Sequence, residues 1–187
     1  MFAITERLLL RPAWDEDAQA LFHAIADEGI VRNLASAPWP YLPCHAESFV
    51  ATPRTAHRPV SLIFLRTGGV PELAGCIGID TMPDGEVEMG YRIARKHWGT
   101  GIATEAGGAK LRFARDTLRL PRIIAGHFLD NPASGRVLRK IGFQPTGAVL
   151  MRTSVARACE TPMAEYVIEL NRDEDIAPVA ACPKLAA

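Results

Sequence analysis

Residues 97–106 read HWGTGIATEA, in which two glycines stand just before a run of small and apolar helix formers. The first N–H groups of a helix lack intrahelical acceptors, and the helix dipole adds partial positive charge at that end. Glycines at this place allow an anion to approach the backbone without obstruction by a Cβ atom. The stretch therefore predicts either a plain turn into a helix or an anion-binding helix N-terminus.

The glycine pattern does not match the common nucleotide-binding loops. No lysine follows Gly101, so the GK[ST] ending of a P-loop is missing. A dinucleotide-binding fingerprint usually lies in the βαβ unit that opens a domain, whereas three antiparallel strands are expected before this loop. On the glycines alone, the turn and the anion site remain open alternatives.

Patterning on both sides of the loop predicts an α+β fold with a mixed sheet. Strands are expected at 6–11, 61–66, 72–80, 86–93, 122–129, 147–152 and 163–170, and helices at 15–28, 45–51, 99–116 and 131–141. The strands between 61 and 93 form an antiparallel meander, and the helix at 99–116 crosses over to a parallel neighbour. Asp15 is the expected N-cap of the first helix. Asn131 and Pro132 are expected to start the last helix, and Gly142 with Phe143 to end it.

Composition limits the classes of function. The 187 residues are 48% hydrophobic and 22% charged, with 21 basic and 21 acidic residues, so no net positive field favours nucleic acid or an anionic membrane. The four cysteines form no CxxC pair and have no metal-like spacing with the histidines, so no metal site is expected. No signal peptide and no membrane-spanning run is recognised. We expect a cytoplasmic protein with one domain at 1–170 and a mobile tail at 171–187.

Four stretches together resemble the GNAT superfamily of acyl-CoA-dependent N-acetyltransferases, within it the subgroup of ribosomal-protein N-terminal acetyltransferases. In chain order they are ERLLLRP (6–12), EMGYRI (88–93), HWGTGIATEA (97–106) and NPASGRVLRKIGF (131–143). The resemblance implies a GNAT-type mixed, mostly antiparallel, twisted sheet of about six to seven strands with about four helices. It also implies a splayed central strand pair, and acetyl-CoA as the acetyl donor.

The resemblance further implies where coenzyme A would bind. The pyrophosphate would lie on the backbone of the loop and first helical turn, namely Trp98, Gly99, Thr100, Gly101, Ile102, Ala103 and Thr104. The backbone of the preceding strand, including Tyr91, Arg92 and Ile93, would pair with the pantetheine arm. Asn131 would contact that arm, and Ser134 would lie near its sulfur.

Acetyl transfer to an amine needs a base, a stabilised oxyanion and a proton for the leaving sulfur. Glu88 is the first candidate for the base, directly or through water, and His127 is the second; both side chains have a purely structural alternative. Many family members place a tyrosine acid where this sequence has Leu138. In the ribosomal-type subgroup a serine at the Ser134 position fills that role.

The sequence therefore predicts an acetyl-CoA-dependent N-acetyltransferase that acts by direct transfer in a ternary complex, without a cysteine nucleophile and without a metal. The acceptor is a primary amine, either a protein N-terminus or a small molecule, and the chain is a monomer or a homodimer. Trp39 and Tyr41 either shape the acceptor pocket or pack in the core. The alternatives are a catalytically silent CoA-binding sensor or interaction protein, and a nucleotide-binding regulator.

Overall fold

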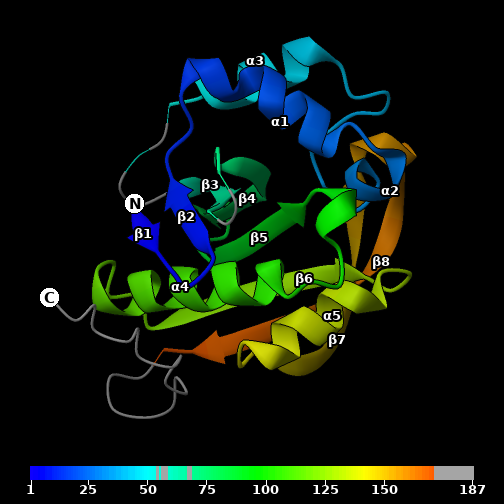
Figure 1. Ribbon diagram of the computed structural model, residues 1–187. Coiled ribbons are helices and arrows are strands. Elements are labelled where there is room, and N and C mark those ends of the chain that lie inside the picture. The colour runs from blue at the N-terminus through cyan, green and yellow to red at the C-terminus, as the bar shows by residue number, and fades with distance from the viewer. Residues whose placement is uncertain (54, 56–58, 67–68, 171–187) are drawn as a thin grey trace, which may run out of the picture.

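The computed structural model describes residues 1–53, 55, 59–66 and 69–170 (Figure 1). The predicted tail at 171–187 lies outside them. The strands are β1 Ala3–Ile4, β2 Leu8–Arg11, β3 Val60–Leu65, β4 Glu72–Thr81, β5 Val87–Ile93, β6 Arg122–Phe128, β7 Gln144–Ser154 and β8 Cys159–Glu169. The α-helices are α1 Ala18–Ile25, α2 Glu28–Val31, α3 Pro43–Ala51, α4 Ile102–Asp116 and α5 Pro132–Lys140. Three 3-10 turns, η1 Asp15–Asp17, η2 Arg95–His97 and η3 Val155–Arg157, complete the elements.

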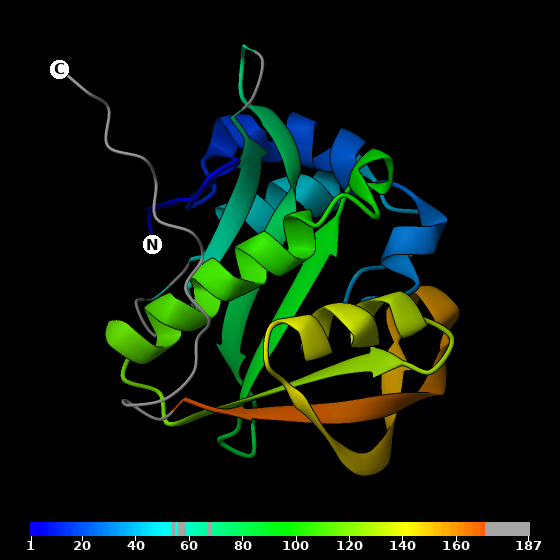
Figure 2. The ribbon, with the colours of Figure 1, turned by 60° about the horizontal axis from the view of Figure 1, so that its bottom comes forward.

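One eight-stranded sheet has the order β1-β2-β3-β4-β5-β6-β8-β7. All neighbouring strands are antiparallel except β5 and β6, which pair in parallel at one register position, Glu88 opposite Ile124. Beyond that position the two strands diverge (Figure 2). The predicted class, the meander and the splayed parallel pair are thereby confirmed, with slightly more strands than the predicted six to seven. The additional strand, β1, is two residues long, too short to leave a periodic signal.

Helices cover both faces of the sheet and divide the core in two (Figure 1). On one face, buried residues of α4 and α5 such as Ile102, Ala106 and Leu138 pack against β4, β5 and β6. On the other face, residues of α1 and α3 such as Leu21 and Ala46 pack against β3 and β4. Because side chains alternate along a strand, consecutive residues of β5 are directed to opposite layers.

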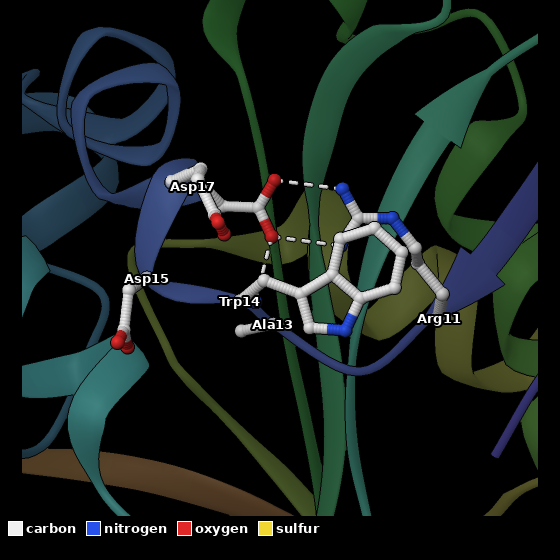
Figure 3. Close-up of a pocket in the computed structure, with 6 residues that line it drawn as sticks. Arg11, Ala13, Trp14, Asp15 and Asp17 are labelled. Atoms are coloured by element: carbon white, nitrogen blue, oxygen red, sulfur yellow. Dashed lines mark hydrogen bonds and ion pairs between the residues drawn. The ribbon is translucent and has the colours of Figure 1, made fainter.

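The single helix predicted at 15–28 is wrong, because tertiary contacts divide it. The Asp17 carboxylate accepts hydrogen bonds from Arg11 Nη2 (2.7 Å) and from the Trp14 backbone N–H (2.8 Å), which forms the η1 turn ahead of α1 (Figure 3). Asp15 is therefore not the N-cap. After α1 ends, Asp27 is extended and separates it from α2. Strands β7 and β8 are also longer than predicted, since they form a long antiparallel pair with each other.

The predicted ends of α5 are confirmed. Asn131 Oδ1 accepts a hydrogen bond from the Ser134 N–H (3.4 Å), and Pro132 occupies the first helical position. At the other end Gly142 has φ +103°, and the Phe143 N–H donates to the Leu138 carbonyl (3.0 Å). This is the hydrogen-bond pattern of a left-handed glycine cap, closed by the buried Phe143 ring.

Helix α4 carries a lysine that is fully buried. Lys110 Nζ donates hydrogen bonds to the Pro59 carbonyl (2.8 Å) and to Ser61 Oγ (3.0 Å). No carboxylate is its partner in these bonds, and burial lowers the pKa of Lys110 to about 7. At pH 7 the folded chain therefore holds a substantial fraction of this amine uncharged.

The lysine makes stability depend on pH. Between about pH 7 and 10.4 the unfolded chain binds a proton at this position that the folded chain does not, so stability should rise by up to about 1.4 kcal/mol per pH unit. We expect Lys110→Met to remove this rise. Urea unfolding of both proteins at pH 7, 8 and 9 measures it, with the exposed Lys140→Met as control. Equal pH slopes in wild type and Lys110→Met would contradict the prediction.

Candidate active site

The loop before α4 has an open backbone. Gly99 (φ +76°) and Gly101 (φ +84°) are both left-handed, and Gly101 is the N-cap of α4. A Cβ at Gly99 would meet no atom within 4 Å, and one at Gly101 would meet only Arg7 Nη2, at 3.4 Å. The first backbone hydrogen bond of α4 is from Glu105 to Gly101 (3.0 Å). In the described chain the N–H groups of residues 99–104 thus have no acceptor and are open to an anion.

Arg7, in the segment between β1 and β2, holds this loop in place. Its Nη1 donates to the Thr100 carbonyl (2.9 Å), and its Nε to Glu105 Oε2 (2.8 Å). Thr5 Oγ1 also donates to the Glu105 carboxylate. Although burial acts to raise the pKa of Glu105, these hydrogen bonds lower it overall. Arg7 was not predicted as a site residue; its only signal in the sequence is its place in ERLLLRP.

The loop is also tied to β5. The Trp98 indole Nε1 donates to the Ile93 carbonyl (2.8 Å), and Thr100 Oγ1 donates to the His97 carbonyl (2.7 Å). Ile102 is buried and Ala103 packs against the same core. Ile102 and Ala103 therefore contribute their side chains to the core. Only their backbone groups face the loop.

Strand β5 divides its side chains between the two layers. Met89 and Ile93 are buried against α4, and Tyr91 points to the same layer. Arg92 points the other way, with its guanidinium carbon 4.1 Å from the centre of the Phe49 ring on α3. By the same alternation Glu88 and Gly90 lie on the Arg92 face.

On the α5 side, two hydroxyls meet where β5 leaves β6. Tyr91 Oη lies 2.7 Å from Ser134 Oγ and also donates to the Ser134 carbonyl (3.2 Å). Burial raises the pKa of Tyr91 to about 12, against the opposing effect of the Ser134 hydrogen bond. Tyr91 was predicted only for its backbone, so its hydroxyl was missed. Residues 43 positions apart give no sequence signal for such a contact.

On the opposite face, Glu88 stands at the closed end of the diverging pair. Its Oε2 lies 3.6 Å from Arg152 Nη2 on β7. Burial raises the pKa of Glu88, with the Arg152 charge opposing and neighbouring carboxylates adding to the rise. Two residues further along, a Cβ at Gly90 would meet no atom within 4 Å, so the strand is open there. A carboxylate with a raised pKa beside open space is an arrangement suited to a general base.

The family model described as acetyltransferase (GNAT) domain matches residues 7–144, about three quarters of the chain. The chain belongs to the GNAT acetyltransferase family. Among curated relatives, the uncharacterized N-acetyltransferase YoaA of Bacillus subtilis is 32% identical over 160 residues, 80% of this chain and 87% of its own.

Solved structures of GNAT acetyltransferases show the same fold. One from Bacillus anthracis has a TM-score of 0.77 at 24% identity and covers 91% of this chain and 99% of its own. The structure titled RimL, ribosomal L7/L12 alpha-N-protein acetyltransferase, in complex with coenzyme A, has a TM-score of 0.74 at 18% identity, covering 92% and 99%.

In this GNAT chain His127 does not join Glu88. It lies on the α5 side of β6, where Nδ1 is 2.8 Å from the Phe128 carbonyl and the ring packs 5.5 Å from that of Tyr166. A Cβ at Gly135 would lie 2.4 Å from His127 Nε2, so the ring fills the space beside that glycine. These contacts support the structural alternative for His127.

Tyr41 and Trp39, the two candidates for the acceptor pocket, lie in different environments. Tyr41 is 6% exposed, stacks on Phe22 with ring centres 6.5 Å apart, and belongs to the core between α1 and α3. Trp39 is 42% exposed in the loop between α2 and α3. Tyr41 is thus a packing residue of the GNAT fold, and of these two residues only Trp39 presents a broad apolar surface to solvent.

A shallow hollow lies at β2 and η1, lined by Arg11, Ala13, Trp14, Asp15, Glu16 and Asp17 (Figure 3). Its buried charges satisfy each other, because Arg11 makes two hydrogen bonds of 2.7 Å to Asp17. Arg11 also stacks on Trp14, at 3.8 Å. The Arg11–Asp17 ion pair therefore stabilises the turn between β2 and α1 of the GNAT fold. Among described residues no cluster of metal-ligating side chains occurs, and no helix there is long and apolar enough to cross a membrane.

Proposed function

We propose that this chain is an acetyl-CoA-dependent N-acetyltransferase that transfers the acetyl group directly to a primary amine. The observation that carries the proposal is the set of N–H groups at 99–104, without acceptors in the described chain and exposed by Gly99 and Gly101. A diphosphate fits this site because it needs several convergent donors and close backbone approach. The coenzyme A complex of the RimL structure supports the same choice.

Several other residues would complete the coenzyme A site. Beyond Glu88 the β6-facing edge of β5, through Tyr91 and Arg92, has no ladder partner in β6. That edge can take the amides of an extended pantetheine arm as an added strand. Asn131, at the N-cap of α5, and Trp98, whose indole binds the Ile93 carbonyl, would contact the same cofactor. Acetyl-CoA, when bound, supplies an activated acetyl group as a thioester.

The base and the acid of the reaction would lie on opposite faces of β5. Glu88 takes a proton from the acceptor ammonium, so the amine nitrogen can form the new bond to the acetyl carbon. On the other face Tyr91 keeps its proton at neutral pH and can donate to Ser134 Oγ. As the carbon–sulfur bond breaks, Ser134 gives its proton to the departing sulfur, while the nitrogen loses its second proton to solvent and solvent returns a proton to Ser134. This hydroxyl pair takes the place of the tyrosine that Leu138, buried in the core, cannot supply.

Thiol release from acetyl-CoA across a panel of primary amines, both peptide N-termini and small molecules, tests the proposal. We expect release that depends on the amine, and a kcat at least tenfold lower in Ser134→Ala, because a positioned acid contributes about a hundredfold or more. The exposed Ser48→Ala on α3 serves as control.

Two results would overturn the proposal. Calorimetric binding of coenzyme A with no turnover of any amine would establish a silent sensor. Preference for ATP or NAD over coenzyme A would establish a nucleotide-binding regulator.

A further inference from the structure

Arg92 carries a charge that the fold leaves unpaired. Its Nε and Nη2 atoms are buried and have no hydrogen-bond partner, the two such side-chain atoms in the described residues. Its contact with the Phe49 ring, at 4.1 Å, covers one face of the guanidinium and satisfies none of its N–H donors. Burial of unpaired guanidinium donors destabilises a fold, so this arrangement needs a reason.

Arg11 shows how the same fold treats a structural arginine. It also stacks on aromatic rings, at 3.8 Å from Trp14 and 4.2 Å from Phe64. Unlike Arg92, it is neutralised by two hydrogen bonds of 2.7 Å to Asp17 (Figure 3). The difference marks Arg92 as a cation whose partner is not one of the described side chains.

The unpaired atoms indicate the shape of that partner. Nε and Nη2 form one edge of the planar guanidinium, and their two parallel N–H donors match the two oxygens of a carboxylate. The residue as a whole is only partly buried, but Nε and Nη2 themselves are covered, so neighbouring side chains must move for a carboxylate to reach them.

Arg92 also lies on the side of β5 where the acceptor would react. Glu88, Gly90 and Arg92 alternate onto one face, and the space over Gly90 is open. Along this face the order is a candidate base, an opening and an unpaired cation. Glu88 and Arg92 are four residues apart, which corresponds to about 13 Å along the strand. Because both side chains are long, their charged groups can lie closer together than their Cα atoms.

We propose that Arg92 binds a carboxylate of the acceptor, so that the acceptor is an amine that also carries a carboxylate. The inference rests on the proposed acetyltransferase function and names its substrate class. Two sources have this chemistry: a free amino acid, through its α-carboxylate, and a peptide with an acidic residue close to its N-terminus.

Matched acceptor pairs test the inference. Thiol release is measured for free amino acids against their carboxamides, and for peptides with glutamate against glutamine at the second position. We expect wild type to prefer the carboxylate member of one pair by at least tenfold in kcat/KM, and the responsive pair identifies the source. In Arg92→Gln this preference should fall to near one, while Arg92→Lys should retain part of it. Arg139→Gln, which removes an exposed arginine stacked 5.5 Å from the Tyr166 ring, should keep the wild-type ratio.

Stability supplies a second readout. Because Arg92 is unpaired in the free protein, Arg92→Gln should have a Tm at least as high as wild type, whereas loss of a structural arginine lowers it. Turnover of amines without carboxylate preference would overturn this inference and leave the acetyltransferase function standing. A lower Tm with an unchanged preference would also overturn it. Turnover of no amine would overturn both.

Discussion

Replacement of Glu88 by glutamine is expected to lower kcat/KM for the acceptor by roughly a hundredfold, within the usual contribution of a positioned general base. Glutamine keeps the size of the side chain, two residues from the open position at Gly90. It cannot take the proton from the ammonium. The loss should therefore appear with both acceptor classes, and the fold should be unaffected.

The pH profile separates a base from a mere binding residue. Burial raises the pKa of Glu88, and a base works only when it is deprotonated. Wild-type activity should therefore rise with pH through this raised pKa, and Glu88→Gln should lack that acid limb. The later rise caused by deprotonation of the amine itself, near pH 8 for an α-amine, should remain in both.

Glu86→Gln is the matched control for this prediction. Glu86 precedes β5 and forms an exposed ion pair with Arg122, at 3.3 Å. Its loss should change kcat/KM little, because exposed ion pairs contribute little. A Glu88→Gln enzyme within a few-fold of wild type, with the acid limb intact, would exclude Glu88 as the base.

Gly101→Val is expected to raise the KM for acetyl-CoA more than tenfold, equivalent to about 1.4 kcal/mol or more of lost binding. A valine here places a branched side chain where the backbone N–H groups face solvent. Gly101 also has φ +84°, a conformation that a β-branched residue resists, so the loop itself would shift. Both effects move the N–H donors away from a diphosphate.

Backbone strain alone can be tested separately at Gly85. This glycine, in the turn between β4 and β5, has φ +89°, and a Cβ there would meet no atom within 4 Å. Gly85→Val therefore carries comparable strain without altering the loop. We expect a lower Tm for both variants and a raised KM for Gly101→Val alone. An unchanged KM in folded Gly101→Val would show that the two glycines form only a turn and have no role in cofactor binding.

Much of the fold followed from local signals. The caps of α5 were predicted because Asn131, Pro132 and Gly142 act on the backbone within a few residues of themselves. The meander and its parallel neighbour followed from turn residues and one crossover helix. Local reasoning failed at 15–28, where Asp17 bonds to Arg11 of a neighbouring strand instead of continuing a helix.

The candidate site was predicted less completely than the fold. The sequence proposed Tyr91 and Arg92 for their backbone, since a strand beside a cofactor needs no particular side chain. The Tyr91 hydroxyl and the unpaired Arg92 guanidinium depend on which face of β5 each residue occupies. For Tyr41 the sequence left pocket and core as alternatives, and the structure places its ring in the core beside Phe22.

The family, the order of the elements and the loop at Gly99 and Gly101 could all be predicted before the structure, because they depend on short-range backbone preferences and contiguous motifs. The tertiary structure alone decided that Arg7 anchors the loop through Glu105, 98 residues away, and that Tyr91 meets Ser134. It also decided that Arg92 is left without a carboxylate. Such contacts arise from strand order and side-chain direction, which bring distant residues together and which no local pattern records.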